Sequence, residues 1–186
     1  MWKYCFQISV LRRVKPAEGY LRPVFLYADE SQTFVSPFDS EYQAVARSAG
    51  GCTVYLTQNR ESYRRVLGNN DTVDALLGNL QCKIFCKNSS VDTNEYAPKI
   101  LGERYVNVVG TNIGRGEEGA GSSGVNRSEQ RRYYLEPAIF STLKHGGINH
   151  AYQVQAIVYK GGHRFPVLTN GRQELLPYTL LTFNQR

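Results

Sequence analysis

Two adjacent carboxylates, Asp29 and Glu30, directly follow the apolar run Val24–Ala28. Such a run is typical of a strand buried in a parallel sheet, and ligands bind beyond the carboxyl ends of such strands. In nucleotide hydrolases an aspartate at this position holds the Mg²⁺ shell, and an adjacent glutamate orients and polarises the attacking water. The pair therefore indicates nucleotide hydrolysis. The alternative is that the two acids simply cap the helix that follows.

A neutral amide, Gln58, follows a second apolar run, Cys52–Thr57. If the two strands are neighbours, their carboxyl ends meet, and Gln58 lies beside Asp29 and Glu30. An amide there can hydrogen-bond both a γ-phosphate and the attacking water, and so sense which nucleotide is bound. The alternative interpretation is a turn-forming Thr-Gln-Asn segment without a ligand.

Arg47 lies between the two runs, at the end of the helical pattern over 40–49. An arginine that reaches the phosphates of a neighbouring subunit stabilises charge in the transition state. A solvated cation at a helix end would explain the same residue. The sequence leaves both interpretations open.

Sequence motifs for other kinds of catalytic or metal-binding site are missing from the 186 residues. A phosphate-binding loop needs Gly-x4-Gly-Lys-Ser/Thr, and the chain contains no Gly-Lys pair. The histidines lie in or beside Gly-rich turns without an HxxxH pair and are interpreted as surface residues: His145, His150 and His163. The four cysteines, Cys5, Cys52, Cys82 and Cys86, lack zinc-ligand spacing. Cys82 and Cys86 are interpreted as two small core thiols, which fits a reducing compartment.

The elements that must position these residues alternate along the first hundred residues. Apolar, β-branched runs predict strands at 24–28, 52–57 and 83–86. Helices are predicted before, between and after them, at 2–14, 40–49, 61–67, 72–80 and 94–101. This alternation predicts an α/β sheet with crossover connections.

The pattern changes after residue 109. The segment 110–129 is rich in Gly, Ser and charge, and we expect it to be a flexible linker. The predicted organisation is therefore an α/β unit at 1–109, the linker, and an appendage at 130–186.

The appendage is expected to contain a short helix and a β-hairpin. The helix is predicted at 137–143. In the hairpin, the alternating strand 152–160 turns at Gly161-Gly162 and returns over 164–169. A further turn at 170–171 precedes a last strand within 175–183.

The composition fits a folded domain. The chain has 22 Lys and Arg against 16 Asp and Glu, a net charge of +6, and 41% hydrophobic residues. This balance excludes a collagen, a coiled coil and a wholly disordered chain. No run approaches the roughly 20 apolar residues of a membrane-spanning helix and no export signal is found, which predicts a cytoplasmic protein. A pI near 9.2 permits nucleic-acid contact, but the basic residues form no stripe.

The order of the motifs is more specific than any one of them. The chain reads VFLYADESQTF, then AVARSAGGCTVYLTQN, then LLGNLQCKIFCKN and TNEYAPKILGE. In this order the motifs resemble the C-terminal part of type IV secretion, or conjugative, coupling ATPases, in the TraD and TraG branch that carries a TraM recognition site. QAIVYKGGHRF is similar to the C-terminal β segment of that branch. The opening WKYCFQISVLRR resembles the helix before its Walker B strand.

The resemblance implies a fold and a set of roles. The fold would be an incomplete RecA-like P-loop NTPase core, the C-terminal half of its sheet, with a small β-rich appendage. Asp29 and Glu30 match the Walker B pair, so Asp29 would bind Mg²⁺ through water and Glu30 would be catalytic. Gln58 matches a catalytic, nucleotide-contacting glutamine. Arg47 matches an arginine finger that acts in trans.

Members of this family are hexamers anchored at the cytoplasmic face of the inner membrane. They use ATP and Mg²⁺ to bring relaxase-bound DNA to a type IV secretion channel. The chain departs from this pattern because the membrane anchor and the Walker A loop are absent, so we expect it to be inactive alone.

Two functions follow from the sequence. The chain is expected to be a fragment of a DNA-transfer coupling protein that hydrolyses ATP when intact. The alternative is a non-catalytic module that recruits a DNA-processing partner through residues 130–186. A self-contained enzyme of another chemistry lacks any supporting group of residues, and the sequence assigns no residue to DNA contact.

Overall fold

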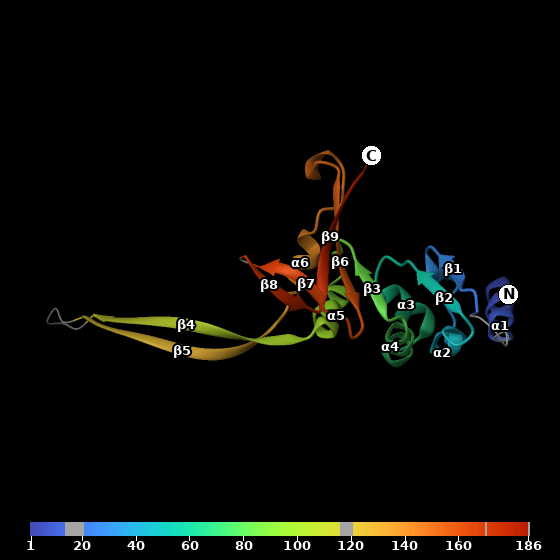
Figure 1. Ribbon diagram of the computed structural model, residues 1–186, viewed down its shortest axis with the longest axis horizontal. Helices are drawn as coiled ribbons and strands as arrows, with labels where there is room; N and C mark the ends of the chain where they lie inside the picture. Colours follow the sequence, from blue (N-terminus) through green and yellow to red (C-terminus); the bar gives the residue numbers. More distant parts are fainter. Residues whose placement is uncertain (14–20, 116–120, 170, 186) are drawn as a thin grey trace.

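The computed structural model describes residues 1–13, 21–115, 121–169 and 171–185. These residues form a mixed α/β structure with four separate sheets. The molecule is elongated, with helix α1 at one end and a long two-stranded ribbon at the other (Figure 1). Within the described residues, no helix has the length and apolarity needed to span a bilayer.

The first sheet is a parallel pair, β1 (Val24–Ala28) and β2 (Gly51–Tyr55). Between these strands the chain passes through a short 3-10 turn, η1 (Ser31–Thr33), and helix α2 (Pro37–Ala46). The expected strand–helix–strand crossover is therefore confirmed. The ladder runs from the Val24–Gly51 pair to the Ala28–Tyr55 pair, so both strands end at the same edge.

Helix α1 (Trp2–Leu11) packs on α2 and forms a small core with it. The buried members of this core are Val10, Tyr42, Ala46 and Ala49. Gly51 is required here because a Cβ at this position would lie 2.6 Å from the Tyr42 hydroxyl. The predicted helix is confirmed as far as Leu11, and Val14 lies outside the described residues.

Two short helices follow β2, α3 (Arg60–Leu67) and α4 (Asn70–Asn79). The side chains of Asn59 and Asn69 cap their N-termini by accepting backbone N–H groups. The helices pack around a second core made of Val35, Tyr63, Val73 and Leu76. Both helices were expected from the sequence, within one or two residues at each end.

The third predicted strand exists, but its pairing differs from the expectation. Strand β3 (Cys82–Phe85) pairs antiparallel with β6 (Gln153–Lys160), and β6 pairs with β9 (Tyr178–Asn184). In the described residues β3 has no ladder with β2. Helices α5 (Val91–Leu101) and α6 (Ala138–Thr142) cover this sheet, and their core joins Ala97 and Leu101 to Phe140, Leu143 and Ile157. This core draws on residues from both sides of the segment predicted as a linker.

The predicted hairpin between 152–160 and 164–169 is wrong. Strand β6 is the centre of its sheet, so both of its edges are already occupied by β3 and β9. Strand β7 (Phe165–Thr169) pairs instead with β8 (Arg172–Leu176). The short connection between them includes Gly171, whose φ of +76° suits a tight turn.

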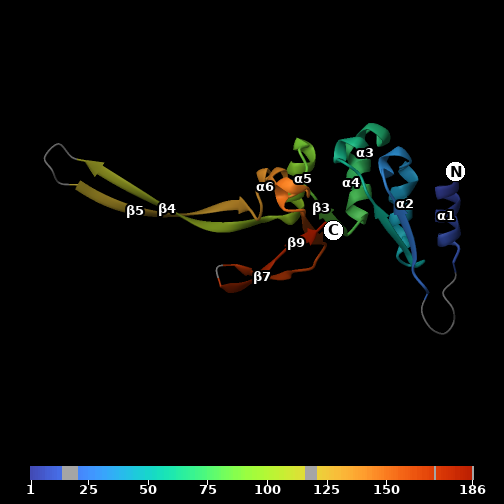
Figure 2. The same ribbon diagram turned by 90° about the horizontal axis from the view of Figure 1, so that it is seen from above.

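The segment 110–129, expected as a linker, forms most of a long antiparallel ribbon where it is described. Strands β4 (Glu103–Arg115) and β5 (Gly121–Tyr133) pair along their whole length, and the ribbon projects away from the body (Figures 1 and 2). Residues 116–120 of the expected linker lie outside the described residues. Cross-strand backbone hydrogen bonds do not depend on side-chain composition, so Gly and Ser can take part in them.

Candidate functional site

The two carboxylates lie immediately beyond β1, and both are exposed. Glu30 has φ 47° and ψ 42°, a left-handed conformation that reverses the chain after the strand. Its N–H donates to Asp29 Oδ1 at 2.9 Å. Its carbonyl accepts the Thr33 N–H at 2.9 Å, which starts the η1 turn. The turn therefore presents both carboxylates at the carboxyl edge of the sheet.

The structure brings Gln58 against Glu30. Gln58 Nε2 donates to Glu30 Oε1 at 3.1 Å, and Gln32 Nε2 donates to Glu30 Oε2. Each carboxylate oxygen of Glu30 thus has an amide donor. Because amides carry no net charge, the carboxylate is held in place while its negative charge stays uncompensated.

The turn that carries Glu30 is fixed to the end of β2. The Ser31 N–H and Oγ donate to the Leu56 carbonyl at 2.9 and 2.8 Å. The buried Ser31 hydroxyl also hydrogen-bonds the Tyr63 hydroxyl at 2.5 Å. Burial raises the pKa of Tyr63, so this phenol stays protonated and able to donate. Backbone and Ser31 side-chain hydrogen bonds therefore hold together the loops that carry Glu30 and Gln58.

Arg47 does not join this group within the chain. It follows α2 and precedes β2, so it lies toward the opposite edge of the sheet from Glu30 and Gln58. Its side chain is exposed. In one copy of the chain Arg47 is therefore placed to act outward, not on the Glu30 side.

The donor set for a metal is small. Among the described residues, no three His, Cys, Asp or Glu side chains gather as metal ligands. Mg²⁺ at phosphoryl-transfer sites commonly keeps several waters and binds through one or two carboxylates together with substrate phosphates. The exposed carboxylate of Asp29 fits that mode of binding.

Sequence reasoning missed Asn88, which follows β3. Its Nδ2 donates to the Gln58 carbonyl at 2.6 Å, and its N–H donates to the Phe140 carbonyl at 3.1 Å. Asn88 thus links the Gln58 loop to α6. Asn88 could have been found by the pattern that identified Glu30 and Gln58, a polar residue shortly after an apolar strand.

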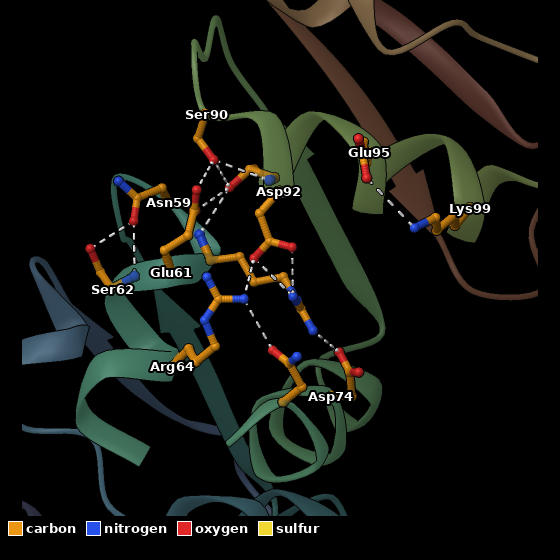
Figure 3. Close-up of polar contacts among 12 residues, drawn as sticks. Asn59, Glu61, Ser62, Arg64, Asp74, Ser90, Asp92, Glu95 and Lys99 are labelled. Carbon is orange, nitrogen blue, oxygen red and sulfur yellow. Dashed lines mark hydrogen bonds and ion pairs between the residues drawn. The ribbon is translucent and has the colours of Figure 1, made fainter. Parts of the chain in front are cut away.

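A second polar cluster fixes the start of α3 to α4 and α5 (Figure 3). Arg60 Nη1 donates to both oxygens of Asp92 at 3.0 and 2.9 Å, and Nη2 donates to Asp74 at 2.7 Å. Its guanidinium also lies 5.4 Å from the centre of the Tyr96 ring. Burial lowers the pKa of Arg60, but the two carboxylates outweigh that effect and raise it. In this cluster each charge is paired with another, so we interpret its role as stabilising the packing of α3 against α4 and α5.

Comparison with known proteins identifies the fold. The family model described as the TraM recognition site of TraD and TraG matches residues 23–145. The bacterial conjugative coupling protein TrwBΔN70, in its unbound monoclinic form, superimposes with a TM-score of 0.62 at 19% identity, over 95% of this chain and 35% of that chain. The plasmid coupling protein TrwB in complex with the non-hydrolysable GTP analogue GDPNP gives 0.61 at 18% identity, over 100% and 37%.

These structures share their fold with the chain, which spans a little over a third of their length. No curated protein sequence matches the chain.

Proposed function

The chain belongs to the family described as the TraM recognition site of TraD and TraG, and we propose that it is part of a conjugative coupling protein. Within that protein, the chain would carry one side of the ATP site. The contact between Gln58 and Glu30 carries this proposal. It places a fixed carboxylate and a neutral amide at the carboxyl edge of parallel strands, where nucleotide ligands bind in α/β sheets.

The roles proposed for the residues are those that the family resemblance implies, and the observed positions of Glu30 and Gln58 support them. Asp29 would hold Mg²⁺ through water, and Glu30 would accept a proton from the attacking water. Gln58 would contact the γ-phosphate and keep Glu30 oriented through its amide. When bound, ATP with Mg²⁺ supplies the phosphoanhydride that is cleaved. The TrwB structure with a GTP analogue supports nucleotide binding as a property of this fold.

The other side of the site would come from outside these residues. The 186 residues contain no Gly-x4-Gly-Lys-Ser/Thr motif, so we propose that a separate segment supplies the phosphate-binding loop. Residues 1–109 would then contain the Walker B side of a RecA-like core, and 130–186 an appended unit that packs on β3 and α5. The β4–β5 ribbon takes the place of the connection expected over 110–129. The assembled protein would be a hexamer at the cytoplasmic face of the inner membrane that brings relaxase-bound DNA to a secretion channel.

Complementation tests the proposal. Adding a segment that carries the phosphate-binding loop should give ATPase activity, and Glu30→Gln should lower kcat by about 100-fold or more, because a general base contributes about that factor. Glu41→Gln is the matched control, since Glu41 is an exposed carboxylate on α2. Full activity in the Glu30→Gln protein would remove the role proposed for Glu30.

The same assay tests Arg47 as a finger that acts in trans. Arg47→Ala should lower the activity of assembled rings by about 1,000-fold, as expected for loss of an arginine finger, and leave isolated protomers unaffected. Arg65→Ala, which changes another exposed arginine, is the control. An equal loss in rings and protomers would contradict action in trans.

The description of the matching family favours a second function, recruitment of a partner. We propose that the 130–186 segment, together with the ribbon, docks a DNA-processing protein of the TraM kind. The ribbon and residues 130–145 lie within the matched range 23–145. The full chain is needed for this test, because β3 and α5 complete the sheet and core of that segment. Capture of the partner by the chain should survive Asp29→Ala, and loss of capture in that variant would tie recruitment to the nucleotide site instead.

A further inference from the structure

Four basic side chains gather in a cluster that is separate from the Glu30–Gln58 pair. They come from three segments: Lys87 after β3, Lys144 and His145 after α6, and His150 in the 3-10 turn η2 (Ile148–His150). Lys87 Nζ lies 3.3 Å from His145 Nδ1. The rings of His145 and His150 meet edge to face with their centres 4.5 Å apart.

The backbone holds both histidines in place. His145 forms a bridge with Val154, and the flanking Lys144 carbonyl accepts the Gln155 N–H at 2.8 Å. Ala151 and Tyr152 then have φ values of 51° and 56°, the left-handed region that residues with a Cβ seldom adopt. They directly follow His150, and the Tyr152 N–H donates to the Gly147 carbonyl at 2.8 Å, which closes the loop that carries His150. Strained backbone of this kind is often found at functional sites.

The charges that face His150 are all positive. The pKa of His150 is lowered by partial desolvation, then by His145, Lys87 and Lys144. The other segments at this position supply neutral amides: Gln153 accepts Lys144 Nζ at 2.7 Å, and Gln185 accepts the Gly147 N–H at 2.9 Å. The described contacts of this cluster thus include cations and amides and no carboxylate.

The tautomer of His145 follows from its partner. A lysine ammonium has only donors, so Lys87 Nζ must donate to His145 Nδ1, and the ring proton is on Nε2. The lone pair at Nδ1 is therefore occupied by a cation, which disfavours a metal ion there. An anion would instead be attracted by Lys87 and by the imidazolium form of His150, and it could accept the Nε2–H of His145.

One connection joins the cluster to the loop of Gln58. Lys87 is next in sequence to Asn88, whose side chain donates to the Gln58 carbonyl. Lys87 and His145 are both exposed, so a solute can reach them.

We propose that Lys87, His145 and His150 form a binding site for a phosphate group. The site goes beyond the proposed ATPase and does not depend on it, since none of the three residues belongs to the Walker B group. Its ligand is a phosphate oxyanion, from a nucleotide or from the backbone of a nucleic acid. Binding takes up a proton on His150 and is therefore stronger at acidic pH.

The three histidines of the chain allow a direct test by NMR of the imidazole signals. Inorganic phosphate added to the full chain, against sodium chloride of equal ionic strength, should shift the signals of His145 and His150. The signal of His163 is an internal control, because that ring packs on Phe165, away from the cluster. Absence of a shift beyond the chloride control, or an equal shift of His163, would overturn the site.

Variants and pH give the second readout. Lys87→Gln should weaken phosphate binding about fivefold or more through loss of one charge-assisted hydrogen bond, and Lys87→Arg should restore most of it. Sulfate stays a dianion between about pH 5.5 and pH 8, so its affinity reports histidine protonation alone and should fall as the pH rises. Affinity that is independent of pH, or binding unchanged by Lys87→Gln, would overturn the proposal.

The source of the phosphate is resolved by comparing ATP with a short oligothymidylate. Shifts of His145 and His150 at a lower concentration of the oligonucleotide assign the site to nucleic-acid backbone. Shifts at a lower concentration of ATP assign it to nucleotide. Response to Zn²⁺ with no response to phosphate, ATP or oligonucleotide would overturn the site in favour of a two-histidine metal site.

Discussion

Asp39 and Glu30 are both carboxylates with several hydrogen-bond donors, yet their surroundings differ. Asp39 is 0% exposed, and its donors come from α1, the start of α2 and β2: Lys3, Gln7, Ser36 and Tyr55. Glu30 is exposed, and its side-chain donors are the neutral amides of Gln32 and Gln58. A buried carboxylate paired with a cation holds elements together, whereas an oriented carboxylate without a cation can act on a ligand.

The pKa of Asp39 shows how this pairing works. Burial raises the pKa of Asp39, but its hydrogen bonds, with Lys3 foremost, outweigh that effect and lower the pKa below the usual 3.8. Burial and the neighbouring Asp39 charge raise the pKa of Tyr55, so its hydroxyl stays a donor. Asp39 therefore joins helix α1 to the strand pair through charge as well as packing.

The largest expected effect comes from removing that charge. Asp39→Ala should lower the free energy of unfolding by about 3–5 kcal/mol, because Lys3 is left with an unpaired, mostly buried ammonium. Urea unfolding followed by circular dichroism measures this loss. Glu41→Gln, on the exposed side of the same helix, is the control. A loss below about 1 kcal/mol would show that Asp39, like Glu30, contributes little to the free energy of unfolding.

Acid provides a second readout of the same prediction. The folded-state pKa of Asp39 lies below its unfolded value, so its contribution is complete above about pH 4 and is lost as the pH falls through the folded value. The unfolding free energy of Asp39→Ala should therefore fall less steeply with acid than that of the unchanged protein. Parallel acid profiles for the two proteins would contradict the lowered pKa.

An intermediate effect is expected from the cluster of Figure 3. Arg60→Ala should cost about 2 kcal/mol of unfolding free energy, because Asp92 and Asp74 are only partly buried and recover some solvation. Thermal melting measures the change, with Arg65→Ala as a surface control. Arg60→Lys should recover part of the loss but not the two-oxygen contact with Asp92. A loss as large as that of Asp39→Ala would show that the loss of charge pairing, and not the degree of burial, determines the change in unfolding free energy.

The smallest expected effect is at the candidate site. Glu30→Gln should change the free energy of unfolding by less than about 0.5 kcal/mol, because an exposed side chain without a paired cation adds little to stability. Differential scanning calorimetry of the unchanged and substituted chains measures the shift in melting temperature. A drop comparable to that of Arg60→Ala would show that Glu30 is part of the scaffold.

The sequence was sufficient to predict the Glu30–Gln58 pair for a physical reason. Apolar runs identify the strands locally, and the carboxyl ends of neighbouring parallel strands meet at one edge whatever the rest of the fold does. The roles of Asp29, Glu30, Gln58 and Arg47 stay predictions until activity is measured.

Contacts between segments that are distant in the chain could not be predicted from the sequence. Nothing local in β6 shows that its neighbours are β3, far upstream, and β9, instead of the β7 segment that follows directly. The partners of Asp39 were hidden for the same reason, because Lys3 and Tyr55 are brought to it only by packing of α1 and β2. The ribbon was missed because its Gly and Ser composition resembles a linker while its order comes from backbone pairing.

The ribbon gives the molecule a mechanical lever. Helix α5 carries Asp92 at its first turn, where Arg60 holds it, and β4 begins directly after the last turn of α5. The 13 residues of β4 extend roughly 44 Å at the rise of an antiparallel strand. A tilt of α5 by about 10° therefore sweeps the far end of a ribbon of that length through about 8 Å. A small rotation of α5 would thus be amplified into a much larger displacement at the far end of the ribbon.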